Sequence, residues 1–244
     1  MMINACSYTD QGGRNNNEDY CAYRTFANGK GIYVLADGLG GHDSGEIASS
    51  HIVEFTIDNG AQINSFSDKD LLDLLDRSNK SLLEKQTEDF RYKNMRTTVV
   101  SVFTENNILK YYNVGDSRFY YFRNGKLIKQ SKDHTVSQMS VDSGEIKYSE
   151  IRFSEDKNKL LKVLGDNENL NIHTIGEPIE MKNSDAFLIC SDGFWEYVYE
   201  TEMEIDLLKS ISEKQWMEFM LKRLLLRVPD DCDNFSLMCS FVDQ

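Results

Sequence analysis

The sequence predicts an α+β fold in which antiparallel sheets are covered by layers of helices. Short runs rich in β-branched and aromatic residues follow one another as hairpin neighbours, and the helical patterns come in two consecutive pairs. A fold built from alternating βαβ units would instead place a helix between successive strands. The order of the patterns therefore favours antiparallel pairing.

The expected strands are runs of apolar, aromatic and β-branched residues bounded by turn residues. They cover residues 3–8, 19–26, 31–36, 97–104, 108–114, 118–123, 126–130, 186–191 and 235–242. The clearest hairpin signal is Asn124-Gly125 between two of these runs, because this dipeptide suits a tight two-residue turn.

Two pairs of helices interrupt the strands. Asp43 and Glu46 have the spacing of a capping box, and the helix that follows should end near Asn59-Gly60. A second helix should begin at about Ser67, because leucines recur after it at helical spacing. The later pair is expected near residues 201–209 and 212–227.

Length and composition indicate one globular domain over residues 1–244. Hydrophobic residues make up 40% of the chain, enough for a substantial core, and no Pro/Gly/Ser-rich linker or internal repeat divides it. The net charge of −13 disfavours nucleic acid as a partner. Apolar runs are far too short for membrane insertion, no secretion signal is recognisable, and five cysteines without a CxxC pair fit a reducing cytoplasm.

The first candidate site lies in VLADGLGGHDSGEIAS, residues 34–49. Asp37 ends an apolar strand, and Gly38, Gly40 and Gly41 follow it without side chains. A carboxylate beside exposed backbone carbonyls suits a hard cation. The spacing excludes a dinucleotide fingerprint and a Walker loop. An ordinary Asp-Gly turn remains open for this stretch alone.

Three further acids repeat this arrangement beside strands. Asp192 follows an apolar strand and precedes Gly193, Asp116 lies after Gly115 between two strands, and Asp233 with Asn234 precedes the last strand. Each alone is more typical of a turn. Together they favour an oxygen-ligand metal cluster at one edge of the sheets.

The segment GGRNNNEDY adds Arg14, Glu18 and Asp19 near the N-terminus. A polar loop with a solvated arginine is the simpler interpretation. Because the other acids are present as well, we favour a functional interpretation. The guanidinium of Arg14 would bind phosphate through its fork of donors, and the carboxylate of Glu18 would hold water on a metal.

These motifs, in this order, resemble the metal-dependent Ser/Thr protein phosphatases of the 2C type (PPM family) in their compact bacterial form. The resemblance rests on GGRNNNED, ADGLGGH with SGE and AS, NVGDSRFYYFRNGKL with KDH, LICSDGFWE and DNFSLM, and it spans nearly the whole chain. It implies two packed antiparallel sheets flanked on both sides by paired helices, a four-layer α-β-β-α sandwich. It also implies hydrolysis of phosphoserine and phosphothreonine in proteins, opposing a Ser/Thr kinase.

The resemblance further implies a centre of two Mg²⁺ or Mn²⁺ ions with a third, weaker site. Asp37 would bridge both ions, Asp192 and Asp233 would complete one, and the Gly38 carbonyl and, through water, Glu18 would serve the other. The remaining implied roles are these: Asp116 at the third ion, Arg14 on the phosphate, and Asn234 in ordering the last ligand loop and in substrate binding.

Two positions depart from the family pattern, and one polar segment resembles the family's flap. Leu39 stands where eukaryotic members carry a histidine that is a candidate general acid, and Arg96 stands where glycine is common before the paired threonines. Residues 134–159 resemble the flap beside the active site, although a mobile surface insertion is an alternative.

Rival functions are a cysteine-dependent phosphatase and a catalytically silent phosphatase-like binding or regulatory module. The first needs arginine six positions after the cysteine, where Cys190 is followed by Glu196 and Cys21 by Ala27. The second should have lost metal ligands, whereas Asp37, Asp192 and Asp233 are all present. The sequence therefore favours an active enzyme.

Overall fold

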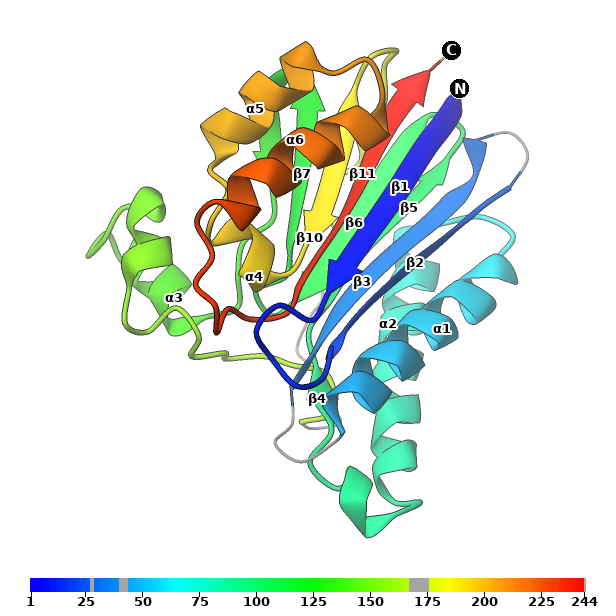
Figure 1. Cartoon of the computed structure of the whole chain (residues 1–244). Coiled ribbons are helices and arrows are strands. Elements are labelled where there is room, and N and C mark those ends of the chain that lie inside the picture. The colour runs from blue at the N-terminus through cyan, green and yellow to red at the C-terminus, as the bar shows by residue number, and fades with distance from the viewer. Residues whose placement is uncertain (27–28, 40–43, 167–175, 244) are drawn as a thin grey trace.

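The strands form two antiparallel sheets that pack face to face in a computed structural model describing residues 1–26, 29–39, 44–166 and 176–243 (Figure 1). The strands are β1 (Met2–Asp10), β2 (Asp19–Thr25), β3 (Gly31–Leu39), β4 (Arg96–Thr97), β5 (Val99–Glu105), β6 (Ile108–Val114), β7 (Arg118–Arg123), β8 (Lys126–Gln130), β9 (Ile179–Glu180), β10 (Ala186–Cys190) and β11 (Phe235–Asp243). One sheet has the order β1-β11-β10-β7-β8 and the other β2-β3-β5-β6-β9, with β4 paired to β3.

Helices cover the outer face of each sheet. They are α1 (Gly45–Ala61), α2 (Asp68–Gln86), α3 (Val136–Asp142), α4 (Asp192–Trp195), α5 (Glu200–Lys209) and α6 (Glu213–Leu225), with 3-10 helices at Phe90–Tyr92 and Tyr148–Phe153. Figure 1 shows α1 and α2 on the side of the sheet that contains β3, and α5 and α6 on the side of the sheet that contains β11. This arrangement confirms the predicted four-layer sandwich. Every described helix is too short or too polar to span a bilayer.

The alternation of side chains along β3 explains why this strand is apolar on both faces. Ile32 and Val34 pack with the buried residues of α1 and α2, whereas Tyr33 and Leu35 belong to the cluster between the sheets. There the Tyr33 ring meets Phe187 of the opposite sheet edge to face, with centroids 5.1 Å apart. A strand buried on both sides reads as a continuous hydrophobic run, as IYVLA does.

Several boundaries differ from the sequence prediction. The expected strand 97–104 is split into β4 and β5 at Thr98, whose N–H donates to the carbonyl of Asp37 at 2.8 Å. The strand at 31–36 continues to Leu39, and β9 and α4 lacked a signal. Asp43 of the predicted capping box lies outside the described residues; within them, α1 begins at Gly45.

Residues 134–159 are folded against the body of the protein. They contain α3 and the second 3-10 helix, in which Ile151 is only 1% exposed. Arg152 beside it donates to both carboxylate oxygens of Glu200, at 2.6 and 2.7 Å, and so ties this segment to the start of α5. These contacts do not fit the alternative of a loose insertion.

Candidate metal centre

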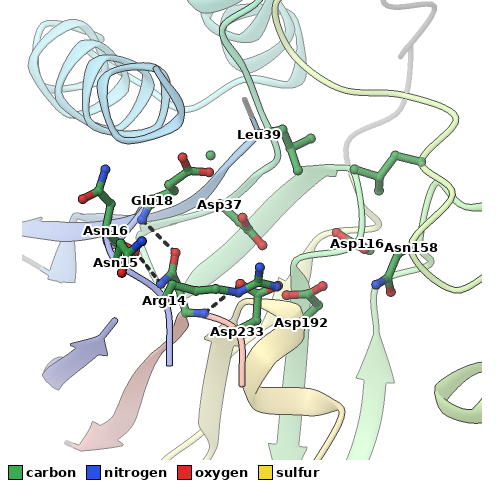
Figure 2. Close-up of a pocket in the computed structure, with 13 residues that line it drawn as sticks. Arg14, Asn15, Asn16, Glu18, Asp37, Leu39, Asp116, Asn158, Asp192 and Asp233 are labelled. Carbon is green, nitrogen blue, oxygen red and sulfur yellow. Dashed lines mark hydrogen bonds and ion pairs between the residues drawn. The ribbon is translucent and has the colours of Figure 1, made fainter. Parts of the chain in front are cut away.

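A cavity of about 610 Å³ collects the acids that the sequence singles out. Its lining includes Glu18, Asp37, Asp116, Asp192 and Asp233. Figure 2 shows the side chains of Asp37, Asp192 and Asp233 turned toward a common space, with Asp116 on one side and Glu18 on the other. Gly38, Arg14 and Asn234 line the same cavity, so the structure brings all the predicted site residues together.

Hydrogen bonds that join the backbone of Asp37 to Thr97 and Thr98 hold this residue near the end of β3. Its carbonyl accepts from the N–H of Thr98 and from Oγ1 of Thr97, both at 2.8 Å, and its own N–H donates to Oγ1 of Thr98 at 3.1 Å. The paired threonines that interrupt the strand at 97–98 therefore position the carboxylate. Asp19 lies directly opposite Asp37 in the β2–β3 register.

Gly38 is required by the close approach of three chain segments. A Cβ at this position would lie 2.2 Å from the carbonyl oxygen of Gly45 and 2.8 Å from that of Glu18. The N–H of Gly38 donates to the Glu18 carbonyl at 3.0 Å. The absence of a side chain at Gly38 thus lets β3, α1 and Glu18, the residue before β2, lie in contact. Gly40 and Gly41 lie outside the described residues.

Asp192 is the first residue of α4, directly after β10. Gly193 lets this helix approach the loop before β11, because a Cβ there would lie 2.1 Å from the carbonyl oxygen of Asn234. The close contact brings Asp192 and Asp233 to the same wall of the cavity.

Asn234 uses both amide N–H groups on the backbone. Nδ2 donates to the carbonyls of Gln11 and Asn16, at 2.8 and 2.9 Å, while Oδ1 accepts from the N–H of Glu18 at 2.8 Å. No donor is then left for a phosphate oxygen. We therefore revise the expected substrate contact: in this arrangement Asn234 orders the N-terminal loop that carries Arg14 and Glu18.

The acids of the cavity repel one another. Burial, followed by the charges of Asp19 and Asp192, raises the pKa of Asp37 well above its usual range. Burial, followed by Asp116, Glu196 and Asp233, does the same to the pKa of Asp192. Burial and the charge of Asp133 raise the pKa of Asp116 to about 7. A divalent cation would relieve this repulsion.

Arg14 does not stand free at the cavity mouth, because its Nη2 donates to Asp233 at 2.9 Å. Within the described ranges, no group of three or more His, Cys, Asp or Glu is arranged so that it could hold a metal ion as it stands. Both side chains of the Arg14–Asp233 pair are about half exposed, so the pair can open at small cost. Opening of the pair would free Oδ2 of Asp233 for a cation and the whole guanidinium fork of Arg14 for a phosphate.

Arg118 is a buried residue beside the Asp116 turn that the sequence analysis did not single out. It is 1% exposed and stacks 3.4 Å from the Trp195 ring, and the indole N–H of Trp195 donates to the carbonyl of Asp116 at 2.9 Å. The sequence signal was the arginine at the start of the apolar run RFYYF. A charge in a buried strand needs a partner, so this position could have been noticed. Asn158 also lines the cavity, and nothing in the sequence marked it.

Comparisons with known proteins show which family the chain belongs to. The family model described as protein phosphatase 2C matches residues 11–227. The chain belongs to the protein phosphatase 2C family. The serine/threonine phosphatase stp of Listeria welshimeri is 31% identical to this phosphatase 2C chain over 219 residues, which cover 84% of each protein.

Solved structures of this family share the whole architecture. The serine/threonine phosphatase Stp1 of Staphylococcus aureus superposes with a TM-score of 0.87 at 26% identity, covering 100% of this chain and 96% of that one. The catalytic domain of the serine/threonine protein phosphatase PstP, solved in complex with two manganese ions, has a TM-score of 0.81 at 25% identity and covers 99% of both chains. Membership of the phosphatase 2C family and the fold predicted from the sequence motifs are thereby confirmed.

Proposed function

We propose that this protein hydrolyses phosphoserine and phosphothreonine in other proteins with the help of two Mg²⁺ or Mn²⁺ ions. The observation that carries the proposal is the meeting of five acidic side chains in one cavity of a phosphatase 2C chain. The relatives named as serine/threonine phosphatases support the reaction, and the manganese-bound PstP domain supports the cofactor.

The donor set of the cavity fits hard divalent cations. All candidate ligands are oxygens, which Mg²⁺ and Mn²⁺ prefer, and the raised pKa values of Asp37 and Asp192 express uncompensated negative charge. We propose that Asp37 bridges two ions. The proposed ligands of the individual ions are Asp192 and Asp233 for one, the Gly38 carbonyl and Glu18 for the other, and Asp116 for a weaker third.

Bound ions of this kind lower the pKa of a water nucleophile and neutralise charge on the phosphoryl oxygens. Arg14, once released from Asp233, presents a planar fork of donors that matches a phosphate. Leu39 has no proton to give, so the leaving alkoxide must take its proton from water or another group.

The proposed substrates are phosphoproteins made by a Ser/Thr kinase, and the proposed location is the cytoplasm. A catalytically silent binding module is not favoured, because every carboxylate expected at the centre is present and lines the cavity.

Release of phosphate from a phosphothreonine peptide, with Mn²⁺ and with EDTA, tests the proposal. We expect turnover with Mn²⁺ alone, and we expect Asp192→Asn to lower kcat by about 100-fold or more, because it removes a negatively charged ligand. Asp230→Asn in the neighbouring loop is the control for charge removal outside the cavity. Absence of turnover by folded protein in Mn²⁺ would favour the silent module.

A further inference from the structure

A second hollow of about 340 Å³ adjoins the metal cavity. Leu39 and Leu160 line both hollows, so the two lie side by side. We call the second hollow the side groove and define it by Leu39, Arg96, Leu160, Leu161 and Lys162, all of which line it.

Main-chain hydrogen bonds hold the walls of the side groove in place. Arg96 of β4 lies directly opposite Leu39 of β3, which puts their side chains on one face of the pair. Thr97 exchanges two backbone hydrogen bonds with Leu164, at 2.9 and 3.2 Å, and the N–H of Leu161 donates to the carbonyl of His134 at 2.8 Å. The groove is therefore preformed, and its frame continues to the Asp116 turn, where the N–H of His134 donates to the Gly115 carbonyl at 2.8 Å.

The charge of the side groove differs from that of the metal cavity. The chain as a whole carries a net charge of −13, and the metal cavity is lined by carboxylates. The side groove instead presents Arg96 and Lys162 beside exposed leucine surface, Leu161 being 48% exposed. Among the described residues that line the groove, the one acid is Asp166, which pairs with Arg96 at 2.9 Å.

The Arg96–Asp166 pair can be joined or replaced by another carboxylate. Both side chains are 47% exposed, and ion pairs at that exposure contribute little to stability. The guanidinium keeps donors beyond the single Nη2 contact, so a second carboxylate can be accepted alongside Asp166.

We propose that the side groove binds the substrate polypeptide next to its phosphorylated residue, and that Arg96 selects an acidic side chain there. The inference rests on the proposed function, since the phosphorylated residue must enter the metal cavity. An extended peptide can place alternate side chains in neighbouring hollows. An acidic side chain of that peptide would be repelled by the carboxylates of the metal cavity but attracted by the side groove. The leucines would pack against the aliphatic part of the same segment.

Two phosphothreonine peptides of equal length, flanked on both sides by glutamate or by lysine, test this selection. Wild-type protein should show a higher kcat/KM for the glutamate peptide, against the preference that the net charge alone would produce. Arg96→Glu should shift the ratio of the two kcat/KM values toward lysine by about three- to tenfold. Turnover of a small aryl phosphate, which cannot reach the groove, should stay within about twofold.

Arg24→Glu is the matched control, because Arg24 is 46% exposed and also forms a single ion pair with an aspartate. It changes the net charge equally and should leave the peptide ratio near that of wild type. Equal ratios for Arg96→Glu and Arg24→Glu would overturn the inference, as would a wild-type preference for the lysine peptide.

Binding of the same labelled peptides, measured by fluorescence anisotropy on an Asp192→Asn background, separates this inference from the proposed function. If the protein binds the glutamate peptide selectively and Arg96→Glu removes that selectivity, the role of the groove in peptide binding would be supported, even if the aryl phosphate were not hydrolysed. Hydrolysis of the aryl phosphate with unselective peptide binding would leave the proposed function intact and refute the groove.

Discussion

Buried acids in this phosphatase 2C protein occur in two different settings. Asp133 is 0% exposed in its side chain and accepts from Arg118 at 2.6 Å, and Asp185 and Asp206 are likewise paired with arginines. In the metal cavity, no ion pair of the described part of the chain joins Asp37, Asp116 or Asp192 to a cation, and their pKa values are raised by burial and mutual charge.

The difference separates structural acids from functional ones. Arginines compensate Asp133, Asp185 and Asp206, which join elements of the fold. Asp37, Asp116 and Asp192 are instead left with repulsion that a bound cation would relieve. Such departures from charge compensation are typical of functional sites. Three measurements test whether this distinction holds.

The largest effect is expected when a structural acid is removed. Asp133→Ala leaves the buried Arg118 guanidinium without its carboxylate and should lower the free energy of unfolding by about 3–5 kcal/mol, measured by urea denaturation. Asp58→Ala, which breaks the exposed pair with Arg24, should cost less than about 1 kcal/mol. A cost for Asp133→Ala no larger than that of Asp58→Ala would contradict the structural role.

A smaller effect of opposite sign is expected in the metal cavity. Asp192→Asn removes repulsion, so without metal its Tm should exceed that of wild type by about 2–4 °C, corresponding to about 1 kcal/mol. Saturating Mn²⁺ should raise the wild-type Tm by about 5–10 °C, and the Tm of Asp192→Asn by less. Differential scanning calorimetry with Mn²⁺ and with EDTA measures both; a lower metal-free Tm for the variant would show that Asp192 stabilises the fold.

The smallest effect is expected at Glu202, a compensated acid nearer the surface. Hydrogen bonds from Arg227 lower the pKa of Glu202 below its ordinary value of 4.5. A lowered pKa contributes stability above the unfolded-state pKa, and that stability is lost as the pH falls through the folded-state pKa. Glu202→Gln should therefore cost about 0.5–1 kcal/mol at pH 7, and the cost should shrink as the pH falls below the ordinary Glu pKa, measured by urea titrations over this pH range. A cost independent of pH would assign the effect to packing instead of charge.

Local patterns were sufficient for most of the fold. Runs of apolar, aromatic and β-branched residues predicted the strands of both sheets except β9. Ser67 marks the start of α2, where its side chain accepts from the N–H of Asp70. These elements depend on residues close together in sequence. The split at Thr98 and the short α4 could not be predicted in this way, because the first depends on a hydrogen bond to Asp37 and the second on packing around Trp195. The single domain over residues 1–244, the kinase and the cytoplasmic location stay predictions.

The motifs in the sequence predicted which acids meet at the site, because each motif places an acid beside a strand and antiparallel strands return to the same edge. How these acids are compensated depends on contacts that form only in the folded chain. Arg14 and Asp233 are 219 positions apart, and Asn234 joins Gln11, Asn16 and Glu18 across a similar separation. The side groove likewise needs β3, β4 and residues 160–162 to lie together. Such contacts follow from the packing of segments that are distant in the sequence, and local periodicity does not predict that packing.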